Sequence, residues 1–311
     1  MSFAIVFPGQ GSQSVGMLAG LAAEWSQVGD TFAEASEALG YDLWKLVQEG
    51  PEADLNQTDK TQPAMLAAGI ATWRVWQAAG GAAPRYMAGH SLGEYTALVA
   101  AGALEFATAI KLVERRGQLM QAAVPEGQGA MAAILGLSDE EVIKACDAAA
   151  QGEVVQAVNF NSPGQVVVAG NAAAVERTMV LAKEAGAKRA LLLPVSVPSH
   201  CALMQPAADE LAKTLAAIEV RTPVIEVLHN VDVAAHQDAD TIRTLLAQQL
   251  HKPVRWVETI QALGRAGTST IVECGPGKVL AGLNKRIERD MNALPVFDAA
   301  SLQAALDAIK G

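Results

Sequence analysis

The hydrophobic positions of this chain follow two recurring patterns. Short continuous apolar runs predict buried strands, and longer stretches with apolar residues three and four positions apart predict helices. Within the first 126 residues these patterns predict strands at 3–7 and 86–89 and helices at 15–25, 31–48, 63–79, 92–101 and 108–122. The first strand ends at Pro8-Gly9-Gln10-Gly11, a sequence typical of a tight loop. Strands separated by helices in this way are typical of a parallel sheet.

A more compact alternation begins near residue 130. It predicts a strand, a helix, two strands, a helix and a strand, at 130–135, 138–150, 154–160, 165–169, 172–186 and 189–194. Ser138-Asp139-Glu140-Glu141 indicates a helix N-terminus, and Asn161-Ser162-Pro163-Gly164 indicates a turn between two Val-rich strands. This βαββαβ order predicts a ferredoxin-like unit.

The first pattern then resumes to the end of the chain. It predicts strands at 224–228 and 269–274 and helices at 203–217, 240–250, 256–266 and 301–310. We therefore predict an α/β protein with a large α/β-hydrolase-like, parallel-sheet domain made of residues 1–126 and 197–311. Residues 127–196 form an inserted ferredoxin-like βαββαβ subdomain, and the site is expected in the cleft between the two.

Composition narrows the class of protein further. The chain has 311 residues, 51% of them hydrophobic and 18% charged, which is enough apolar material for a sizeable core. Its apolar stretches are far shorter than the roughly 20 residues of a membrane helix, and its start lacks the basic flank of a secretion signal. We therefore predict a cytoplasmic protein that does not bind membranes.

Cysteine usage and net charge exclude further classes. Cys146, Cys201 and Cys274 are odd in number and far apart, which argues against disulfides and structural zinc. The formal net charge of −10 argues against nucleic-acid binding, which needs many Lys and Arg contacts to phosphates. An acidic partner would need a local basic patch on this chain.

A candidate nucleophile lies between the second predicted strand and the helix that follows it. Gly89-His90-Ser91-Leu92-Gly93 matches the nucleophile elbow Gly-x-Ser-x-Gly in its expected strand-to-helix context. The sharp turn would raise the Ser91 hydroxyl above the sheet, and the flanking glycines would let strand and helix backbones pass closely.

A serine hydroxyl needs a neighbouring base to become a good nucleophile. His200 follows the last strand of the inserted unit, where the chain returns to the large domain and to the predicted cleft. His90 adjoins the serine but should turn away from the reacting face, and Cys201 is expected to be a packed residue. From the residues alone the remaining histidines stay open as candidates: His229, His236 and His251.

Acyl transfer also needs donors for the developing oxyanion. Leu92 can offer its backbone N–H from the elbow. Gln10 follows the first strand, at the same edge of the predicted sheet, and can offer a second N–H. The Gly-rich loop around Gln10 lacks the Gly-Lys-Ser/Thr ending of a phosphate-binding loop.

One arginine is expected to face the interior. On the predicted helix 108–122, the positions three and four residues from Arg116 are all apolar: Leu112, Val113, Leu119 and Met120. Arg115 has polar neighbours at the same spacing and should be solvated. Because an unpaired buried charge is costly, Arg116 needs either an internal salt bridge or a substrate carboxylate.

With these residues assembled, the chain resembles the malonyl-CoA:acyl carrier protein transacylases of bacterial fatty-acid synthesis and the related acyltransferase domains of polyketide synthases. The resemblance runs nearly end to end. It is carried by Phe7-Pro8-Gly9-Gln10-Gly11-Ser12-Gln13, Thr61-Gln62-Pro63-Ala64, Gly89-His90-Ser91-Leu92-Gly93-Glu94, Arg115-Arg116-Gly117, Asn159-Phe160-Asn161-Ser162-Pro163-Gly164, Val197-Pro198-Ser199-His200 and Glu273-Cys274-Gly275-Pro276-Gly277.

The resemblance implies an [acyl-carrier-protein] S-malonyltransferase that carries malonyl from malonyl-CoA to the phosphopantetheine thiol of acyl carrier protein, by a ping-pong route. It implies no metal and no other cofactor. It gives Ser91 the role of nucleophile, His200 that of base and Arg116 that of carboxylate anchor. Gln10 and Leu92 become the oxyanion donors. Gln249 matches the position whose main-chain carbonyl orients the histidine in place of an aspartate.

Two other functions remain open from the residues. A serine esterase or thioesterase of α/β-hydrolase type would use the same elbow but release its acyl group to water. A carrier-protein binder without activity would have to lack an essential group, and none is missing. An acidic carrier protein would need a basic surface, for which Lys285-Arg286 with Arg289, at helical spacing, is one candidate and Lys188-Arg189 another.

Overall fold

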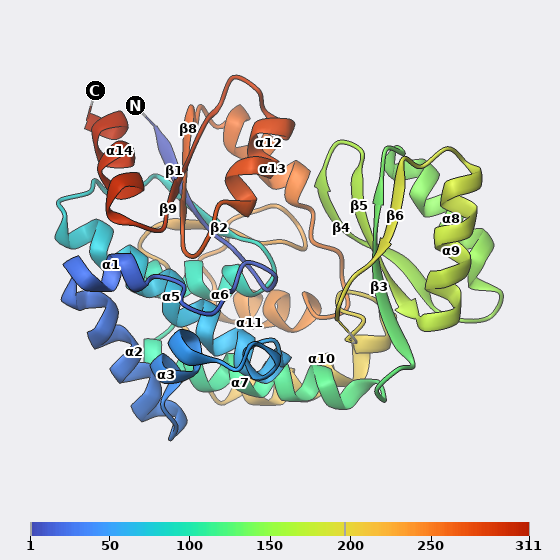
Figure 1. Ribbon diagram of the computed structural model, residues 1–311, viewed down its shortest axis with the longest axis horizontal. Coiled ribbons are helices and arrows are strands. Elements are labelled where there is room, and N and C mark those ends of the chain that lie inside the picture. The colour runs from blue at the N-terminus through green and yellow to red at the C-terminus, as the bar shows by residue number, and fades with distance from the viewer. Residues whose placement is uncertain (1, 196, 311) are drawn as a thin grey trace.

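The structure of the protein, a computed structural model, describes residues 2–195 and 197–310 and contains two sheets (Figure 1). The first is parallel, in the order β7-β2-β1-β8-β9, and the second is antiparallel, in the order β4-β5-β3-β6. The strands of the parallel sheet are β1 (Phe3–Phe7), β2 (Tyr86–Gly89), β7 (Glu226–Leu228), β8 (Thr270–Cys274) and β9 (Asn292–Val296). Those of the antiparallel sheet are β3 (Gly129–Leu135), β4 (Val155–Ser162), β5 (Gln165–Asn171) and β6 (Arg189–Leu192). The predicted α/β class is confirmed.

Strand β1 shows why its sequence is a continuous apolar run. All five of its residues are buried, because helices cover both faces of the parallel sheet. Ile5 and Phe7 pack into the core on one face, and Ala4 and Val6 pack into a separate cluster on the other. The last residue of β1, Phe7, is paired with the last residue of β2, Gly89. The loops after these two strands therefore start side by side.

Helices occupy most of the remaining chain. They are α1 (Ala19–Glu24), α2 (Ser26–Leu39), α3 (Leu43–Glu49), α4 (Glu52–Leu55), α5 (Thr58–Ala78), α6 (Leu92–Ala100), α7 (Phe106–Ala123), α8 (Asp139–Ala150), α9 (Ala172–Glu184), α10 (Gln205–Ala216) after the short 3-10 turn η1 (Ala202–Met204), α11 (Ala239–Gln248), α12 (Trp256–Arg265), α13 (Val279–Ile287) and α14 (Ala299–Lys310). No helix of the described residues is long and apolar enough to cross a membrane.

The prediction of one helix over 31–48 is wrong, since two helices, α2 and α3, share this stretch. Gly40 ends α2 with a φ of 79°, a left-handed conformation that favours glycine. Asp42 then begins α3, because its side chain accepts a hydrogen bond from the N–H of Lys45. Gly40 and Asp42 are both recognisable in the sequence as a helix end and a helix start. The prediction missed them because the helical spacing of apolar residues continues across this stretch.

The antiparallel sheet has the predicted βαββαβ order. Ile134 and Val168 pack under α8 and α9 in a core of their own, whereas Met131 and Val167 belong to a cluster on the opposite face with Cys201. Figure 1 shows α8 and α9 on the side of this sheet that faces away from the parallel sheet. The segment that follows β6 returns toward the parallel sheet and carries His200.

Candidate active site

The turn between β2 and α6 has the geometry of a nucleophile elbow. Ser91 lies between the two elements with a φ of 50° and a ψ of −109°, a strained conformation for a residue with a side chain. A Cβ on Gly89 would lie 1.8 Å from the carbonyl carbon of Gly93, so only glycine fits where strand and helix cross. The predicted strand-turn-helix context of Ser91 is therefore present in the structure.

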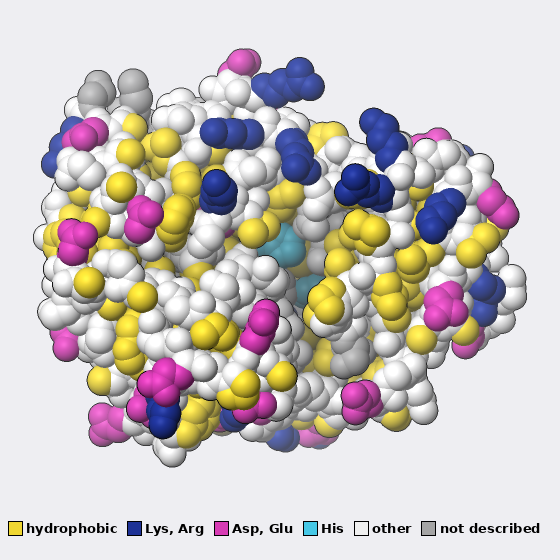
Figure 2. Space-filling view, viewed as in Figure 1, with side chains coloured by type: hydrophobic (Ala, Val, Ile, Leu, Met, Phe, Trp, Pro, Cys, Tyr) yellow, Lys and Arg dark blue, Asp and Glu magenta, His cyan; other side chains and the backbone are white. Residues whose placement is uncertain are grey.

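Ser91 opens into a cavity of about 470 Å³ between the two sheets. The cavity walls come from the loop after β1, from α7, from strands β3 and β4, and from the segment before His200. Figure 2 shows histidine side chains at the bottom of a hollow near the centre of one face of the molecule. Five of the six predicted site residues line the cavity: Gln10, Ser91, Leu92, Arg116 and His200.

His200 contacts the hydroxyl of Ser91. The distance from its Nε2 to the Ser91 Oγ is 2.8 Å, and its Nδ1 donates a hydrogen bond of 2.6 Å to the main-chain carbonyl of Gln249. Because a carbonyl only accepts, the proton sits on Nδ1, and Nε2 is left to accept the serine proton. The contact predicted for Gln249 is thus made by its backbone, outside the cavity.

Burial, and after it the nearby positive charge of Arg116, lower the pKa of His200 to about 3. The hydrogen bond to Gln249 opposes this shift but is outweighed. The imidazole is therefore neutral at physiological pH, which is the state in which it can accept a proton.

Arg116 is buried, with 1% of its surface exposed, and its Nη2 donates to Ser91 Oγ at 3.3 Å and to Gln249 Oε1 at 2.9 Å. Its guanidinium also lies 5.3 Å from the ring of Tyr95. Among the described residues no carboxylate lies within 4.0 Å of it, and its Nε has no hydrogen-bond partner. The internal salt bridge left open by the sequence is therefore not formed, and burial lowers the pKa of Arg116. A bound anion would supply the missing charge.

The two predicted oxyanion donors belong to the segments that follow the neighbouring strands β1 and β2. Gln10 follows β1 and Leu92 begins α6, and both line the cavity. In the described part of the chain, neither backbone N–H has a hydrogen-bond partner. Both N–H groups are therefore free to donate to a bound acceptor.

The other histidines have different environments. His229 is buried and bonds to Glu94, and His236 bonds to Asp232. His251 lies in another hollow, between α10 and α11. His90, which we expected to turn away from the reacting face, contributes to the cavity wall, but its Nε2 donates to Asn161 Oδ1 at 2.8 Å. The structure thus brings one histidine, His200, into contact with Ser91.

The neighbours of His200 and Arg116 in the sequence follow their predictions. Cys201 is buried, with its thiol directed at the carbonyl of Pro198. Arg115 is exposed. In the part of the chain that the structure describes, no three His, Cys, Asp or Glu residues are grouped to hold a metal ion.

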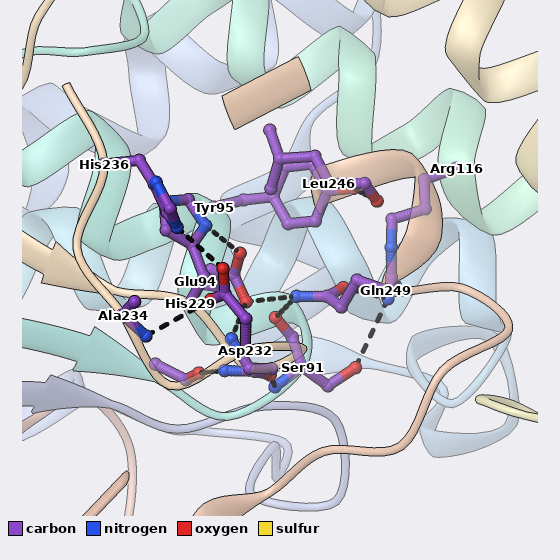
Figure 3. A network of polar contacts seen from close by, with 12 residues as sticks. Ser91, Glu94, Tyr95, Arg116, His229, Asp232, Ala234, His236, Leu246 and Gln249 are labelled. Atoms are coloured by element: carbon purple, nitrogen blue, oxygen red, sulfur yellow. Dashed lines mark hydrogen bonds and ion pairs between the residues drawn. The ribbon is translucent and has the colours of Figure 1, made fainter. Parts of the chain in front are cut away.

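Two side chains that the sequence analysis did not single out hold the site together. Asn230 Oδ1 accepts from the N–H of Ser91, and its Nδ2 donates to the carbonyl of Gly89. Glu94, in the first turn of α6, accepts hydrogen bonds from His229, Asn230 and Gln249 (Figure 3). A signal existed for Asn230, since polar residues after buried strands of one parallel sheet meet at the same edge.

The two predicted basic patches meet in one place. Lys188 and Arg286 line the same groove, of about 760 Å³, between the antiparallel sheet and α13. Figure 2 shows several Lys and Arg side chains along the rim above the central hollow. The helical spacing predicted for Arg289 is wrong, because α13 ends at Ile287 and the backbone of Glu288 is extended. All five basic residues of the two patches are exposed: Lys188, Arg189, Lys285, Arg286 and Arg289.

Comparison with known proteins places this geometry in context. The family model described as the acyl transferase domain matches residues 4–300. A malonyl CoA-acyl carrier protein transacylase from Haemophilus influenzae is 62% identical over 303 residues, 97% of each chain. An acyl carrier protein S-malonyltransferase from Vibrio cholerae is 64% identical, with a TM-score of 0.96 over 98% of this chain and all of that one.

A third relative was solved with its partner. It is a malonyl-transacylase in complex with a type II PKS acyl-carrier protein, and this chain is 59% identical to it. The TM-score is 0.98 over 99% of this chain and all of that chain.

Proposed function

Since this chain belongs to the malonyl CoA-acyl carrier protein transacylases of the acyl transferase family, we propose that the malonyl group it transfers from coenzyme A to acyl carrier protein is carried as an ester on Ser91. The 2.8 Å contact between Ser91 and a neutral, buried His200 is the observation that carries this proposal. The product would supply fatty-acid synthesis.

In the first half-reaction, Ser91 Oγ attacks the thioester carbon of malonyl-CoA while its proton passes to His200 Nε2. The N–H groups of Gln10 and Leu92 stabilise the oxyanion of the tetrahedral intermediate. When the carbon–sulfur bond breaks, His200 returns the proton to the sulfur of coenzyme A. The enzyme is left as the malonyl ester of Ser91.

The second half-reaction repeats these steps with a different thiol. His200 takes the proton of the phosphopantetheine thiol of acyl carrier protein, and the sulfur attacks the ester carbon. The carbon–oxygen bond breaks, and the proton returns from His200 to Ser91 Oγ. Free enzyme and malonyl-carrier protein result.

Arg116 would select the acyl group. A buried guanidinium without a carboxylate partner fits the free carboxylate of malonyl, which a planar fork can bind through two hydrogen bonds. The contact of Arg116 with Ser91 Oγ puts this anchor next to the ester.

The carrier protein would dock on the basic groove. Lys188 and Arg286 line it from two different parts of the chain, which supports a shared role. Positive charge there would attract an acidic carrier protein to an enzyme whose formal net charge is −10.

Domain organisation and location follow as proposals of the same kind. Residues 1–126 and 197–311 would form the catalytic domain and 127–196 the inserted subdomain, because each sheet has a core of its own. The three cysteines are buried and unpaired, which supports a reducing compartment such as the cytoplasm.

Trapping the acyl-enzyme tests the central step. The enzyme is mixed with malonyl-CoA without acceptor, quenched in acid and digested, and the peptide containing Ser91 is examined by mass spectrometry. We expect a malonyl mass increase on Ser91 that disappears when holo-acyl carrier protein is added. A malonyl group on another residue, or release of free malonate without carrier protein, would contradict the proposal.

A further inference from the structure

Glu94 is a buried carboxylate that the reaction steps above do not use. It lies in the first turn of α6 and is 0% exposed. Its Oε1 accepts from His229 Nδ1 at 2.7 Å, and its Oε2 accepts from the N–H of Asn230 at 2.9 Å and from Gln249 Nε2 at 2.8 Å. Figure 3 shows Glu94 near the centre of this network. A buried carboxylate with three donors is a fixed point to which other groups can be tied.

Two of these donors belong to residues that hold the nucleophile. Asn230 bonds to the N–H of Ser91 and to the carbonyl of Gly89, at 2.8 and 2.7 Å. Gln249 Nε2 donates to the carbonyl of Ser91 at 3.0 Å. The side chains that bond to the backbone around the strained serine therefore belong to two residues that Glu94 contacts, Asn230 through its main-chain N–H and Gln249 through its amide.

The same contact decides which way the Gln249 amide points. Its Nε2 has two acceptors, the Glu94 carboxylate and the Ser91 carbonyl, so its Oε1 is turned toward Arg116. Arg116 Nη2 donates to that oxygen at 2.9 Å. With the amide reversed, a donor would face a donor, and Arg116 would lose one of its two hydrogen bonds.

We propose that Glu94 is a positioning residue for acyl-group selection: through the amide of Gln249 it aims Arg116 at the carboxylate of the acyl group. This inference rests on the anchor role proposed for Arg116. It assigns the effect on acyl-group selection to the length of the Glu94 side chain, which brings an acceptor oxygen to Gln249, and not to the negative charge of Glu94.

Two conservative variants separate side-chain length from charge. Glu94→Asp keeps the charge, but its side chain is one methylene shorter, so the carboxylate lies farther from Gln249. Glu94→Gln keeps the length of the side chain. Its amide oxygen can accept from Gln249 and Asn230 while its NH₂ donates to His229, whose ring can take the tautomer with a free Nδ1.

The readout is the ratio of Ser91 acylation rates with malonyl-CoA and acetyl-CoA, measured on variants that keep a cooperative thermal transition. In Glu94→Asp we expect the ratio to fall about tenfold, and in Glu94→Gln to stay within about threefold of the parent. An equal loss with both substrates in Glu94→Asp would show a merely structural role and overturn the proposal. A fall in Glu94→Gln as large as in Glu94→Asp would show that charge decides, which also overturns it.

Gln249→Leu provides an independent arm if Glu94→Asp does not fold. It removes the amide but keeps the main-chain carbonyl that accepts from His200, so the same fall in the ratio is expected. Adding Glu94→Asp to it should change the ratio by less than about twofold, because both changes break one contact. If the losses of the two single variants multiply in the double variant, Glu94 affects the ratio by a route other than Gln249, and the inference is rejected.

Arg116→Ala distinguishes a failure of the anchor role of Arg116 from a failure of the positioning role of Glu94. If that variant leaves the ratio unchanged, the proposed anchor role fails. If it lowers the ratio while Glu94→Asp and Gln249→Leu do not, the anchor stands and the positioning role of Glu94 is rejected.

Discussion

The Nε2 of His200 lies 2.8 Å from the hydroxyl oxygen of Ser91, although 109 positions separate the two residues in the chain. The other ring nitrogen donates to a neutral carbonyl, that of Gln249, where many serine enzymes place an aspartate. No carboxylate therefore raises the pKa of this base, while burial and the charge of Arg116 both lower it.

The pH dependence of acylation should reveal this environment. A histidine accepts protons only when neutral, so activity is lost as the pH falls through its pKa in the folded protein. With that pKa lowered to about 3, acylation by acetyl-CoA should stay nearly constant from pH 8 down to pH 5. A base at the ordinary value would be only about 3% neutral at pH 5 and would lose most of its rate. Stopped-flow or quenched-flow acylation rates would distinguish the two profiles.

Arg116→Ala serves as the comparison for this profile. Removing a nearby positive charge raises the pKa of His200, so the acid limb should move to higher pH. Acetyl-CoA is the suitable substrate because it has no carboxylate to bind at the vacated position. Identical profiles for the parent and this variant would contradict the electrostatic link between the two residues.

Ser91→Ala should fold normally and form no acyl-enzyme, because it removes a hydroxyl that faces a cavity. His200→Ala should lower the acylation rate by about three orders of magnitude or more, as in other serine enzymes that lose their base. His251→Ala, which lies in a different hollow, is the matched control and should keep its rate. Intact mass spectra after mixing with malonyl-CoA provide the measurement, and a large loss in the control would count against His200 as the base.

The elbow should tolerate no side chain at Gly89. In Gly89→Ala the new Cβ would meet the backbone of Gly93 at 1.8 Å, and a backbone cannot move aside as a side chain can. The free energy of unfolding should fall by about 3 kcal/mol or more. Gly282 is the control, because it is exposed on α13 and a methyl group added there would meet no atom within 4 Å. Gly282→Ala should raise that energy by up to about 1 kcal/mol, as denaturant unfolding can show. An unchanged free energy of unfolding in Gly89→Ala would contradict the close crossing of strand β2 and helix α6.

The basic groove should control the encounter with the carrier protein. Arg286→Glu and Lys188→Glu are each expected to raise the KM for carrier protein about tenfold at low salt, with a smaller effect at high salt. Acylation of Ser91 by malonyl-CoA should be unchanged. Lys111→Glu, on the exposed face of α7, is the charge-matched control. Equal effects from the control and the groove variants would remove this groove from consideration.

Much of the site could be predicted because its signals are local. The apolar run of β1, the glycines around Ser91 and the return of the chain at His200 each follow from a few neighbouring residues. The parallel pairing of β1 and β2 then brings Gln10 and Ser91 to one edge of the sheet. The inward direction of Arg116 followed from the apolar neighbours on its helix.

The parts that were missed depend on distant contacts or hidden signals. Glu94 meets Gln249 across 155 positions, and nothing in the sequence around Glu94 shows that donors from two other segments surround it. Strand β9 contains Pro295, which argues against a central strand, but β9 lies at the sheet edge, where a missing N–H is tolerated. The partner of Arg116 could not be settled from sequence either, because an internal carboxylate could have come from any segment.

Arg116 is expected to select the acyl group. The guanidinium is buried, contacts Ser91 Oγ and has no carboxylate partner among the described residues. Removing one partner of a buried charge pair costs about 2 to 5 kcal/mol, so Arg116→Ala should lower kcat/KM for malonyl-CoA by a factor of about 30 or more.

Acetyl-CoA provides the internal comparison, because it has no carboxylate for the guanidinium to bind in the parent enzyme. Its kcat/KM should therefore change little in Arg116→Ala. Arg116→Lys should lie between the two, because an ammonium keeps the charge but cannot form the paired hydrogen bonds of a planar fork. Steady-state kinetics with both substrates, on variants with a cooperative unfolding transition, decide the matter. An equal loss for malonyl-CoA and acetyl-CoA would mean that Arg116 supports the shape of the site and does not read the carboxylate.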